Sequence, residues 1–364
     1  MNVLKHRYLL VADSGATKCS WALLRLLSSA GGGSAGGGDV LRFETAGLNA
    51  AVASAEDVVA FAKESAEQLC FVAGPEAIFP EEAVSLYDDS ARERHSLLRD
   101  DVAEIWIYAA GAVSEEMTVE ITRDFRIFFR NAEVKVCSDM LGAARAVCGD
   151  EPGIVGILGT GSNSCLYDGQ QIAVQGLGGG YVLGDEGSGA WVGKHLLSDY
   201  IRGLLPAEMD EALRRDYALD YPTIVDKVYR SGTPGRYLAS FFPLVLGYAG
   251  IGGERTSGDK SGERCLKSTP DCESKSAGTD KASREYARRL LREGFGAFLD
   301  RCILSRYDCA AYPLNLCGSV AWLCRDIISD CARERNIRIG RILKSPIDGL
   351  IKYHLKNVTV KEQR

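Results

Sequence analysis

Apolar and polar positions follow two rhythms along the chain, one typical of strands and one typical of helices. Continuous apolar runs at 103–111 and 132–139 predict buried strands, and the amphipathic stretch that begins at Ser114 predicts a helix between them. Another helix is predicted to begin at Ser54, because Asp57 completes a capping box ahead of an apolar stripe. Strands that alternate with helices indicate an α/β fold with a largely parallel sheet.

Later in the chain the pattern is mainly helical, with a few exceptions. Apolar runs at 312–319 and 337–343 predict two further strands, and 346–358 predicts a closing helix. The glycine-rich segment 28–39 is expected to form a flexible hairpin tip, since it holds too little apolar surface to pack. The polar segment 252–284 has no period and few apolar residues, so an exposed insertion is predicted there.

One part of the pattern occurs twice. The stretch "VADSGATKCSW", which starts at Val11, matches "ILGTGSNSCLY", which starts at Ile157: an apolar strand, a turn of small residues and a second apolar strand. The match aligns Cys19 with Cys165, and a third strand and helix-forming sequence follow each copy. The repeat predicts two related halves whose turns face each other across one cleft.

The length of the chain supports the same division. A chain of 364 residues exceeds what one hydrophobic core usually serves, so two domains are expected. We place the N-terminal domain at 1–149 and the C-terminal domain at 150–345, with the polar insertion inside the latter. The closing helix at 346–358 is expected to pack on the N-terminal domain.

Composition excludes several classes of protein. The net charge is −6, and acids stand among the basic residues, so no nucleic-acid partner is expected. No apolar run approaches the roughly 18 residues of a membrane span, and the N-terminal run is too short for a signal peptide, which predicts a cytoplasmic protein without a membrane partner. The 12 cysteines include no pair at CxxC spacing, so most thiols are expected to be reduced and inert.

The two small-residue turns suggest phosphate chemistry. Turns of Gly, Ser and Thr present backbone N–H groups as an anion-binding nest, although a single such turn is more often structural. Asp13 ends the strand before the first turn, and a carboxylate beside a bound phosphate would repel it unless a divalent cation lay between them. Because Mg²⁺ prefers one or two carboxylates with phosphate oxygens and water, Asp13 is a candidate Mg²⁺ ligand, and Lys18 a candidate partner for phosphate charge.

Other candidate polar residues come after strands or between glycines. Asp185 and Glu186 stand among glycines just before a helical run, where acids serve either as helix caps or as ligand contacts. Asp139 ends the strand at 132–139 and precedes a helix, the position at which open α/β sheets collect ligands. Asn49 follows a strand in the same way.

Four motifs carry a resemblance that covers nearly the whole chain. "DSGATK", "GTGSN", "GDEGSGAW" and "CGSVA" occur in the order and approximate spacing of the N-acetylglucosamine kinases of the BadF/BadG/BcrA/BcrD ATPase group, within the actin, hexokinase and Hsp70 superfamily. The closing "SPIDGLIKYH" resembles the C-terminal helix of a hexosamine-kinase-like branch. The resemblance implies two ribonuclease H-like (actin-like ATPase) domains with a cleft between them, and an ATP-dependent kinase acting on an amino sugar, most simply N-acetylglucosamine.

The resemblance also implies a role for each motif residue. Asp139 would be the catalytic base, Asn49, Asp139 and Asp185 would bind the sugar, and Asp13 would hold Mg²⁺. The residues that would bind ATP are Asp13, Gly15, Thr17, Lys18, Thr160, Gly161, Ser162, Gly318, Ser319 and Ala321. The family often has threonines before the base, where this chain has Cys137 and Ser138.

Two alternatives stay open at this point. ATPase activators of 2-hydroxyacyl-CoA dehydratases and benzoyl-CoA reductase belong to the same superfamily and hold an iron–sulfur cluster between subunits, for which Cys137 and Cys165 are candidates. A sugar sensor would carry a helix-turn-helix before the first strand, which here begins within ten residues of Met1. The identity of the amino sugar, the nucleotide preference and the role of 252–284 stay open, and a homodimer is common among relatives.

Overall fold

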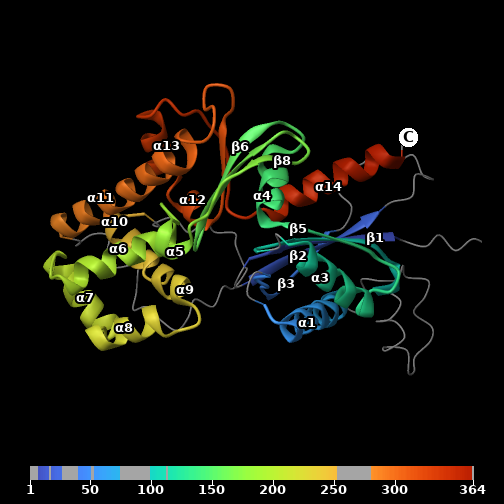
Figure 1. Cartoon of the computed structure of the whole chain (residues 1–364), viewed down its shortest axis with the longest axis horizontal. Coiled ribbons are helices and arrows are strands. Elements are labelled where there is room, and N and C mark those ends of the chain that lie inside the picture. The colour runs from blue at the N-terminus through green and yellow to red at the C-terminus, as the bar shows by residue number, and fades with distance from the viewer. Residues whose placement is uncertain are drawn as a thin grey trace, which may run out of the picture. The chain divides into compact units, whose positions relative to one another are not determined.

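The computed structural model describes residues 7–15, 18–26, 40–50, 53–73, 99–111, 114–251 and 280–362 (Figure 1). The chain divides into two compact units. The first unit comprises the chain up to Asp150 together with the chain from Ser345 onward, and the second unit comprises Glu151–Lys344. Both the glycine-rich segment 28–39 and Thr17 of the first turn lie outside the described residues.

The first unit is built on a five-stranded sheet in the order β3-β2-β1-β4-β5. Its strands are β1 (Arg7–Ser14), β2 (Lys18–Leu26), β3 (Val40–Ala46), β4 (Val102–Ala109) and β5 (Glu133–Ser138). β1, β2 and β3 form an antiparallel meander, and β4 and β5 run parallel to β1. The carboxyl ends of β1, β4 and β5 therefore meet at one edge of the sheet.

Helices cover both faces of this sheet. Figure 1 shows α1 (Ala55–Ala73) and α3 (Glu115–Phe128) on one face, and α4 (Asp139–Cys148) and α14 (Ile347–Glu362) on the other. Aromatic residues fill the layer under α1 and α3: Trp21 stacks on Phe43 with 5.7 Å between ring centroids and packs against Phe61 and Phe125. The indole N–H of Trp21 donates to Thr45 Oγ1 at 3.0 Å, so this buried polar group is satisfied.

The second unit repeats the same sheet topology. Its sheet has the order β10-β9-β6-β7-β8, with β6, β7 and β8 as the antiparallel meander and β9 and β10 parallel to β6. The strands are β6 (Gly153–Leu158), β7 (Ser162–Tyr167), β8 (Ile172–Gln175), β9 (Leu314–Cys317) and β10 (Ile339–Leu343).

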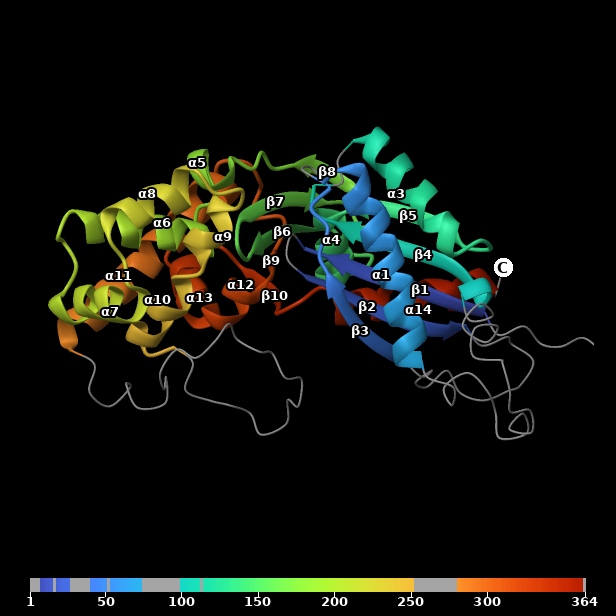
Figure 2. The ribbon, with the colours of Figure 1, turned by 90° about the horizontal axis from the view of Figure 1, so that it is seen from below.

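Most of the second unit outside the sheet is helical (Figure 2). Its helices are α5 (Gly180–Leu183), α6 (Gly189–Ile201), α7 (Ala207–Tyr217), α8 (Tyr221–Tyr229), α9 (Pro234–Ala239), α10 (Phe242–Ala249), α11 (Lys281–Phe298), the π-helix η2 (Leu299–Leu304), α12 (Ser319–Leu323) and α13 (Arg325–Arg333). The predicted insertion at 252–284 is wrong at its end, because α11 begins at Lys281 with Asp280 as its cap. The part at 252–279 lies outside the described residues.

The repeat is confirmed as topology, with two corrections. The sheets are mixed rather than largely parallel, because two of the four pairings in each sheet are antiparallel. The alignment of Cys19 with Cys165 is also wrong in register: Cys19 pairs with Ser14 at the end of β1, whereas Cys165 pairs with Val155 well before the end of β6. Similar hydrophobic patterns fix the order of strands and not the length of the turn between them.

Helix starts were the most accurate feature of the sequence pattern. Ser54 and Asp57 form the predicted capping box, with Asp57 N–H donating to Ser54 Oγ at 3.2 Å and Ser54 N–H donating to Asp57 Oδ2 at 2.9 Å. Ser114 caps α3 by accepting from Met117 N–H at 3.2 Å. Within the described residues, no helix is both long and apolar enough to cross a membrane.

The C-terminal helix belongs to the first unit. Asp348 in its first turn accepts from Arg42 Nη1 of β3 at 2.6 Å. Gly349 packs directly on α4, since a Cβ at this position would lie 2.4 Å from Ala146 O. Leu350 is fully buried. The chain therefore leaves β10 of the second unit and is held again in the first unit within a few residues.

Candidate functional site

Two carboxylates lie at the edge of the first sheet where β1 and β5 end. Asp13 is the last residue but one of β1, and Asp139 follows β5 directly. Burial raises the pKa of Asp13 to about 7, and the negative charge of Asp139 adds to the rise. The hydroxyl of Ser345 donates to Asp13 Oδ2 at 3.5 Å and opposes the rise. Asp13 thus lies close to a second acid and holds its proton more tightly than an ordinary aspartate.

Asp139 is not the cap of its helix. The cap of α4 is Ser138, whose Oγ accepts from Leu141 N–H at 3.3 Å. Asp139 occupies the first helical position, and its Oδ1 accepts from Met140 N–H at 2.9 Å. Burial raises the pKa of Asp139 above the ordinary value for aspartate. A partly exposed carboxylate with no structural duty as a cap is suited to accept a proton from a ligand.

The donor set at this edge fits a magnesium ion. Asp13 and Asp139 offer only oxygen atoms, and each would be stabilised in its ionised form by a cation between them. One or two carboxylates completed by phosphate oxygens and water match the ligands that Mg²⁺ takes in phosphoryl-transfer sites. Lys18, the expected partner for phosphate charge, forms an ion pair with Glu44 of β3, with Nζ 2.6 Å from Oε1.

The same edge holds the segment that carries Asn49. Ser14 Oγ accepts from Leu48 N–H at 2.9 Å, and Ala50 N–H donates to Ala110 O at 2.8 Å. These bonds fix Asn49 beside the ends of β1 and β4. Gly15 closes the first turn, with its N–H donating to Lys18 O at 3.0 Å. The structure therefore brings Asp13, Asp139 and Asn49 to one edge, as the sequence pattern of strand ends indicated.

The turn between β6 and β7 is held by Asp185. The carboxylate oxygen Oδ1 of Asp185 accepts from Ser162 N–H at 3.0 Å. A Cβ on Gly161 would lie 2.9 Å from the same oxygen, so glycine is needed there for the approach of Asp185. Asp185 has a positive φ of 56°, and burial raises its pKa. One donor of the predicted phosphate nest is thus already bonded to an acid, and Asp185 lies at the turn of the second unit.

The N-terminus of α6 fixes this turn from its other side. Gly189 N–H and Ala190 N–H donate to Gly159 O at 2.9 Å and to Thr160 O at 3.0 Å. The cap of α6 is Ser188, whose Oγ accepts from Trp191 N–H at 3.1 Å. The interpretation of the preceding acids as helix caps is therefore wrong, and their side chains have other partners.

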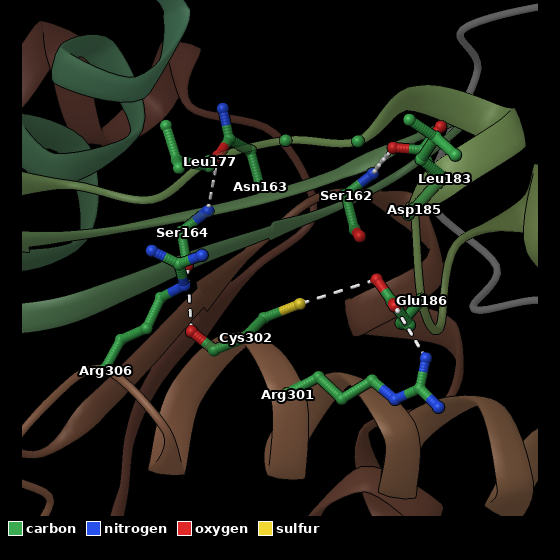
Figure 3. A pocket seen from close by; sticks show the side chains of 13 residues that line it. Ser162, Asn163, Ser164, Leu177, Leu183, Asp185, Glu186, Arg301, Cys302 and Arg306 are labelled. Carbon is green, nitrogen blue, oxygen red and sulfur yellow. Dashed lines mark hydrogen bonds and ion pairs between the residues drawn. The ribbon is translucent and has the colours of Figure 1, made fainter.

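A polar pocket of about 200 Å³ opens beside Asp185 (Figure 3). Its walls come from the start of β7, the glycine-rich segment around α5, the turn at Asp185, and η2 with the residues just after it. Glu186 is 9% exposed; its Oε1 lies 3.5 Å from Arg301 Nη1 and its Oε2 accepts from the Cys302 thiol at 3.6 Å. Arg306 lines the same pocket. Paired acids, arginines and serines make a wall suited to hydroxyl and amide groups.

Sequence reasoning missed the residues that η2 contributes. Arg301 and Cys302 of η2, and Arg306 just after it, belong to none of the motifs quoted above. The signal that marks them is a π-helix, a distortion that is often found at functional sites but that has no hydrophobic period of its own. Only the fold brings Arg301 and Cys302 to Glu186, which is more than a hundred residues away in the chain.

The motif "CGSVA" lies at the start of α12. Gly318 has a φ of 120°, and a Cβ there would lie 2.2 Å from Leu158 O, so the backbone needs glycine for its approach to the end of β6. Ser319, the first residue of α12, is exposed. Ala321 is fully buried in the core of the second unit, so its side chain offers no surface to a nucleotide in this arrangement.

Solved structures are similar to this chain over almost its whole length. A structure from Porphyromonas gingivalis, provisionally named an N-acetylglucosamine kinase, aligns with 28% identity and a TM-score of 0.72, over 96% of this chain and 99% of its own. A second structure with the same provisional name, from Chromobacterium violaceum, aligns with 18% identity and a TM-score of 0.62, over 96% and 99%. No family model and no curated protein matches the sequence.

The chain has the two-domain α/β fold of actin-like ATPases. The fold class expected from the sequence is therefore confirmed. The predicted site residues of the first unit, Asp13, Gly15, Asn49 and Asp139, lie at one edge of its sheet. Those of the second unit, Thr160, Gly161, Ser162, Asp185 and Gly318, lie around the end of β6.

Proposed function

We propose that the protein is an ATP-dependent sugar kinase that phosphorylates a hydroxyl of an amino sugar, most simply N-acetylglucosamine to N-acetylglucosamine 6-phosphate. The observation that carries the proposal is the pair formed by Asp13 and Asp139 at the edge of the first sheet. The fold shared with the Porphyromonas gingivalis protein supports it, because that protein bears the name of an N-acetylglucosamine kinase. ATP and Mg²⁺ are the implied cofactors.

The proposed mechanism gives each acid one task. Asp139 accepts the proton of the sugar hydroxyl as that oxygen attacks the γ-phosphorus of ATP. Asp13 would hold Mg²⁺, which supplies charge neutralisation on the phosphates when it is bound. Asn49 and Asp185 bind sugar hydroxyls, and the pocket beside Asp185 offers further polar partners. At the second turn the backbone N–H groups of Thr160 and Gly161 bind phosphate oxygens, since Ser162 N–H donates to Asp185. The first turn, at Gly15, lies against the phosphates, and Ser319 lies near the nucleoside.

The direct test is an ADP-release assay with ATP and Mg²⁺ across a panel of hexosamines. We expect a rate above the sugar-free background for N-acetylglucosamine, with glucosamine and N-acetylmuramic acid as the closest comparisons. Small differences between sugars are decided by a few pocket groups, so the panel ranks substrates rather than assuming one. A rate that no sugar raises above background contradicts the kinase proposal.

The variant Asp139→Asn tests the role of the base. We expect kcat to fall by roughly 10² to 10⁴, because Asn cannot accept the hydroxyl proton, with a modest change in the KM for the sugar. Ser138 still caps α4 in this variant, so the helix is expected to keep its start. The matched control is Asp326→Asn on α13, which is expected to leave kcat unchanged. Near-normal turnover of Asp139→Asn removes Asp139 from the role of base.

The iron–sulfur activator remains the rival, and the burial of its candidate ligands counts against it. Cys165 is fully buried in β7, where it cannot reach a cluster shared with a partner subunit. Burial raises the pKa of the Cys137 thiol, which disfavours the thiolate that a cluster requires. An iron assay and a visible spectrum of protein purified without oxygen decide the matter, because a bound cluster would overturn the kinase proposal.

A further inference from the structure

The tryptophans of this chain differ sharply in exposure. Trp21 is 1% exposed, whereas Trp322 is 38% exposed, and its neighbour Leu323 is 38% exposed as well. Trp106 and Trp191 are partly buried. A single exposed aromatic residue needs no explanation by itself, so the place of Trp322 in the fold has to carry the argument.

Trp322 belongs to α12, whose start packs against the end of β6 although the two segments lie far apart in the chain. Gly318 packs against Leu158 O, two residues before Thr160, and its N–H donates to Leu343 O at 2.9 Å. These contacts fix the start of α12 at the end of β6, and α12 lies beside β9 and β10 in Figure 2. The backbone N–H of Trp322 donates to Gly318 O at 3.0 Å, so the backbone of Trp322 is one helical turn beyond Gly318, about 6 Å along the axis.

The indole ring is held in place by a cation. The guanidinium carbon of Arg325 lies over the ring of Trp322, 5.2 Å from its centroid, and Arg325 Nη1 donates to Trp322 O at 3.2 Å. A guanidinium on one face limits the orientations of the indole, and the 38% of Trp322 that stays exposed is the surface available to a second planar group. Large flat rings held in this way are suitable platforms for stacking a nucleobase.

We propose that Trp322 stacks on the base of the bound nucleotide, with Arg325 holding the ring in position. The proposal rests on the proposed function, which binds phosphates at the turn directly after β6 and so leaves the base to reach α12. Stacking recognises the flat face that every base has, so Trp322 contributes affinity for ATP and GTP alike. The choice between these nucleotides belongs to other groups.

The test compares Trp322→Ala with the wild-type protein in calorimetric titrations with ATP, GTP and inorganic tripolyphosphate, each with Mg²⁺. We expect affinity for ATP and for GTP to fall by about 5- to 100-fold, and affinity for tripolyphosphate to stay unchanged, because only the base loses its partner. Unchanged ATP affinity overturns the proposal. An equal loss for tripolyphosphate also overturns it, since the phosphate site would then be affected.

Two further variants keep the result interpretable. Tyr229→Ala removes another exposed aromatic ring of the second unit, 79% exposed at the end of α8, and should leave all three affinities unchanged. Trp322→Phe keeps a ring, so ATP should bind within a few-fold of wild type, but the quenching of tryptophan fluorescence by ATP should be smaller than in the wild-type protein. Quenching as large as that of the wild-type protein overturns the proposal. Wild-type protein that binds no ATP would instead contradict the proposed function itself.

Discussion

The carboxylates of the proposed site reduce the stability of the fold that holds them. Asp13, Asp139 and Asp185 all have a raised pKa, and burial is the largest cause for each. Acids that serve the fold have the opposite shift: the pKa of Asp168 is lowered because backbone N–H groups of Gln171 and Gln170 donate to it. The direction of the pKa shift therefore distinguishes Asp13, Asp139 and Asp185 from a structural acid such as Asp168.

The variant Asp13→Asn should stabilise the protein, and more so at high pH. The pKa of Asp13 is about 7 in the folded chain and about 3.9 when unfolded, so the folded state holds an extra proton between these values. Stability therefore falls as pH rises through this window, and Asn avoids the loss. The measurement is made in EDTA. At pH 8 we expect the free energy of unfolding to rise by about 1–2 kcal/mol, after discounting for the partial exposure of Asp13, which corresponds to a rise in Tm of roughly 3–6 °C. At pH 5 we expect a smaller rise in Tm.

Asp168→Asn is the control, for which the expected change in Tm has the opposite sign. Its pKa is lowered in the folded state, so ionised Asp168 adds stability that is present above its unfolded pKa and is lost on acidification. We expect Asp168→Asn to lower Tm at pH 8. A rise in Tm for Asp13→Asn that is equal at pH 8 and pH 5 would mean that the surroundings of Asp13 do not raise its pKa.

Single residues were predictable where a strand end or a glycine marked them. The position of Asp13 and Asp139 at one edge of the sheet follows from the sequence pattern because both stand at strand ends, and parallel strands bring their ends together. Arg301 and Trp322 were not predicted, because a π-helix and a five-residue helix carry no periodic signal. The bond between Asp185 and Ser162 N–H was also unforeseen, since two glycine-rich motifs gave no sign that they pack together.

At the scale of elements, caps and strand order followed local rules, whereas register did not. Ser54 and Ser114 start their helices as the pattern indicated, because a capping box and a cap involve neighbours in sequence. The register of the two hairpins depends on turn length, and this is where the alignment of Cys19 with Cys165 went wrong. The packing of α14 on α4 depends on a close approach at Gly349 that no local pattern encodes.

Gly349→Ala tests this close approach. A methyl group would lie 2.4 Å from Ala146 O and 2.7 Å from Ala146 Cα, so backbone would have to move. Alanine favours a helix over glycine by about 1 kcal/mol, but overpacking against a rigid helix costs about 1–3 kcal/mol, so the free energy of unfolding should fall. Urea denaturation measures the change. Gly232→Ala is the matched control, with nothing within 4 Å of its added Cβ, and should stay within about 0.5 kcal/mol of wild type.

The whole molecule consists of two copies of one sheet topology joined twice by the chain. The first connection leads from the end of α4 into β6, and the second leads from β10 through Ser345 into α14. Each copy places a tight turn directly after its first strand, at Gly15 in one unit and at Gly159–Ser162 in the other. If one triphosphate binds both turns, as the proposed function requires, ligand binding must slow amide exchange in both units.

Hydrogen exchange measures that requirement directly. With ATP and Mg²⁺ we expect slower amide exchange in peptides covering Ser14–Gly15 and in peptides covering 159–162, because a triphosphate held at both turns limits their local opening. With ATP and EDTA the protection at Ser14–Gly15 should be lost first, since Asp13 repels the triphosphate when no Mg²⁺ lies between them. Peptides covering α8 serve as the internal control and should not change. Protection confined to 159–162 in the presence of Mg²⁺ would mean that the turn after β1 has no part in binding the nucleotide, and that Asp13 is not its metal ligand.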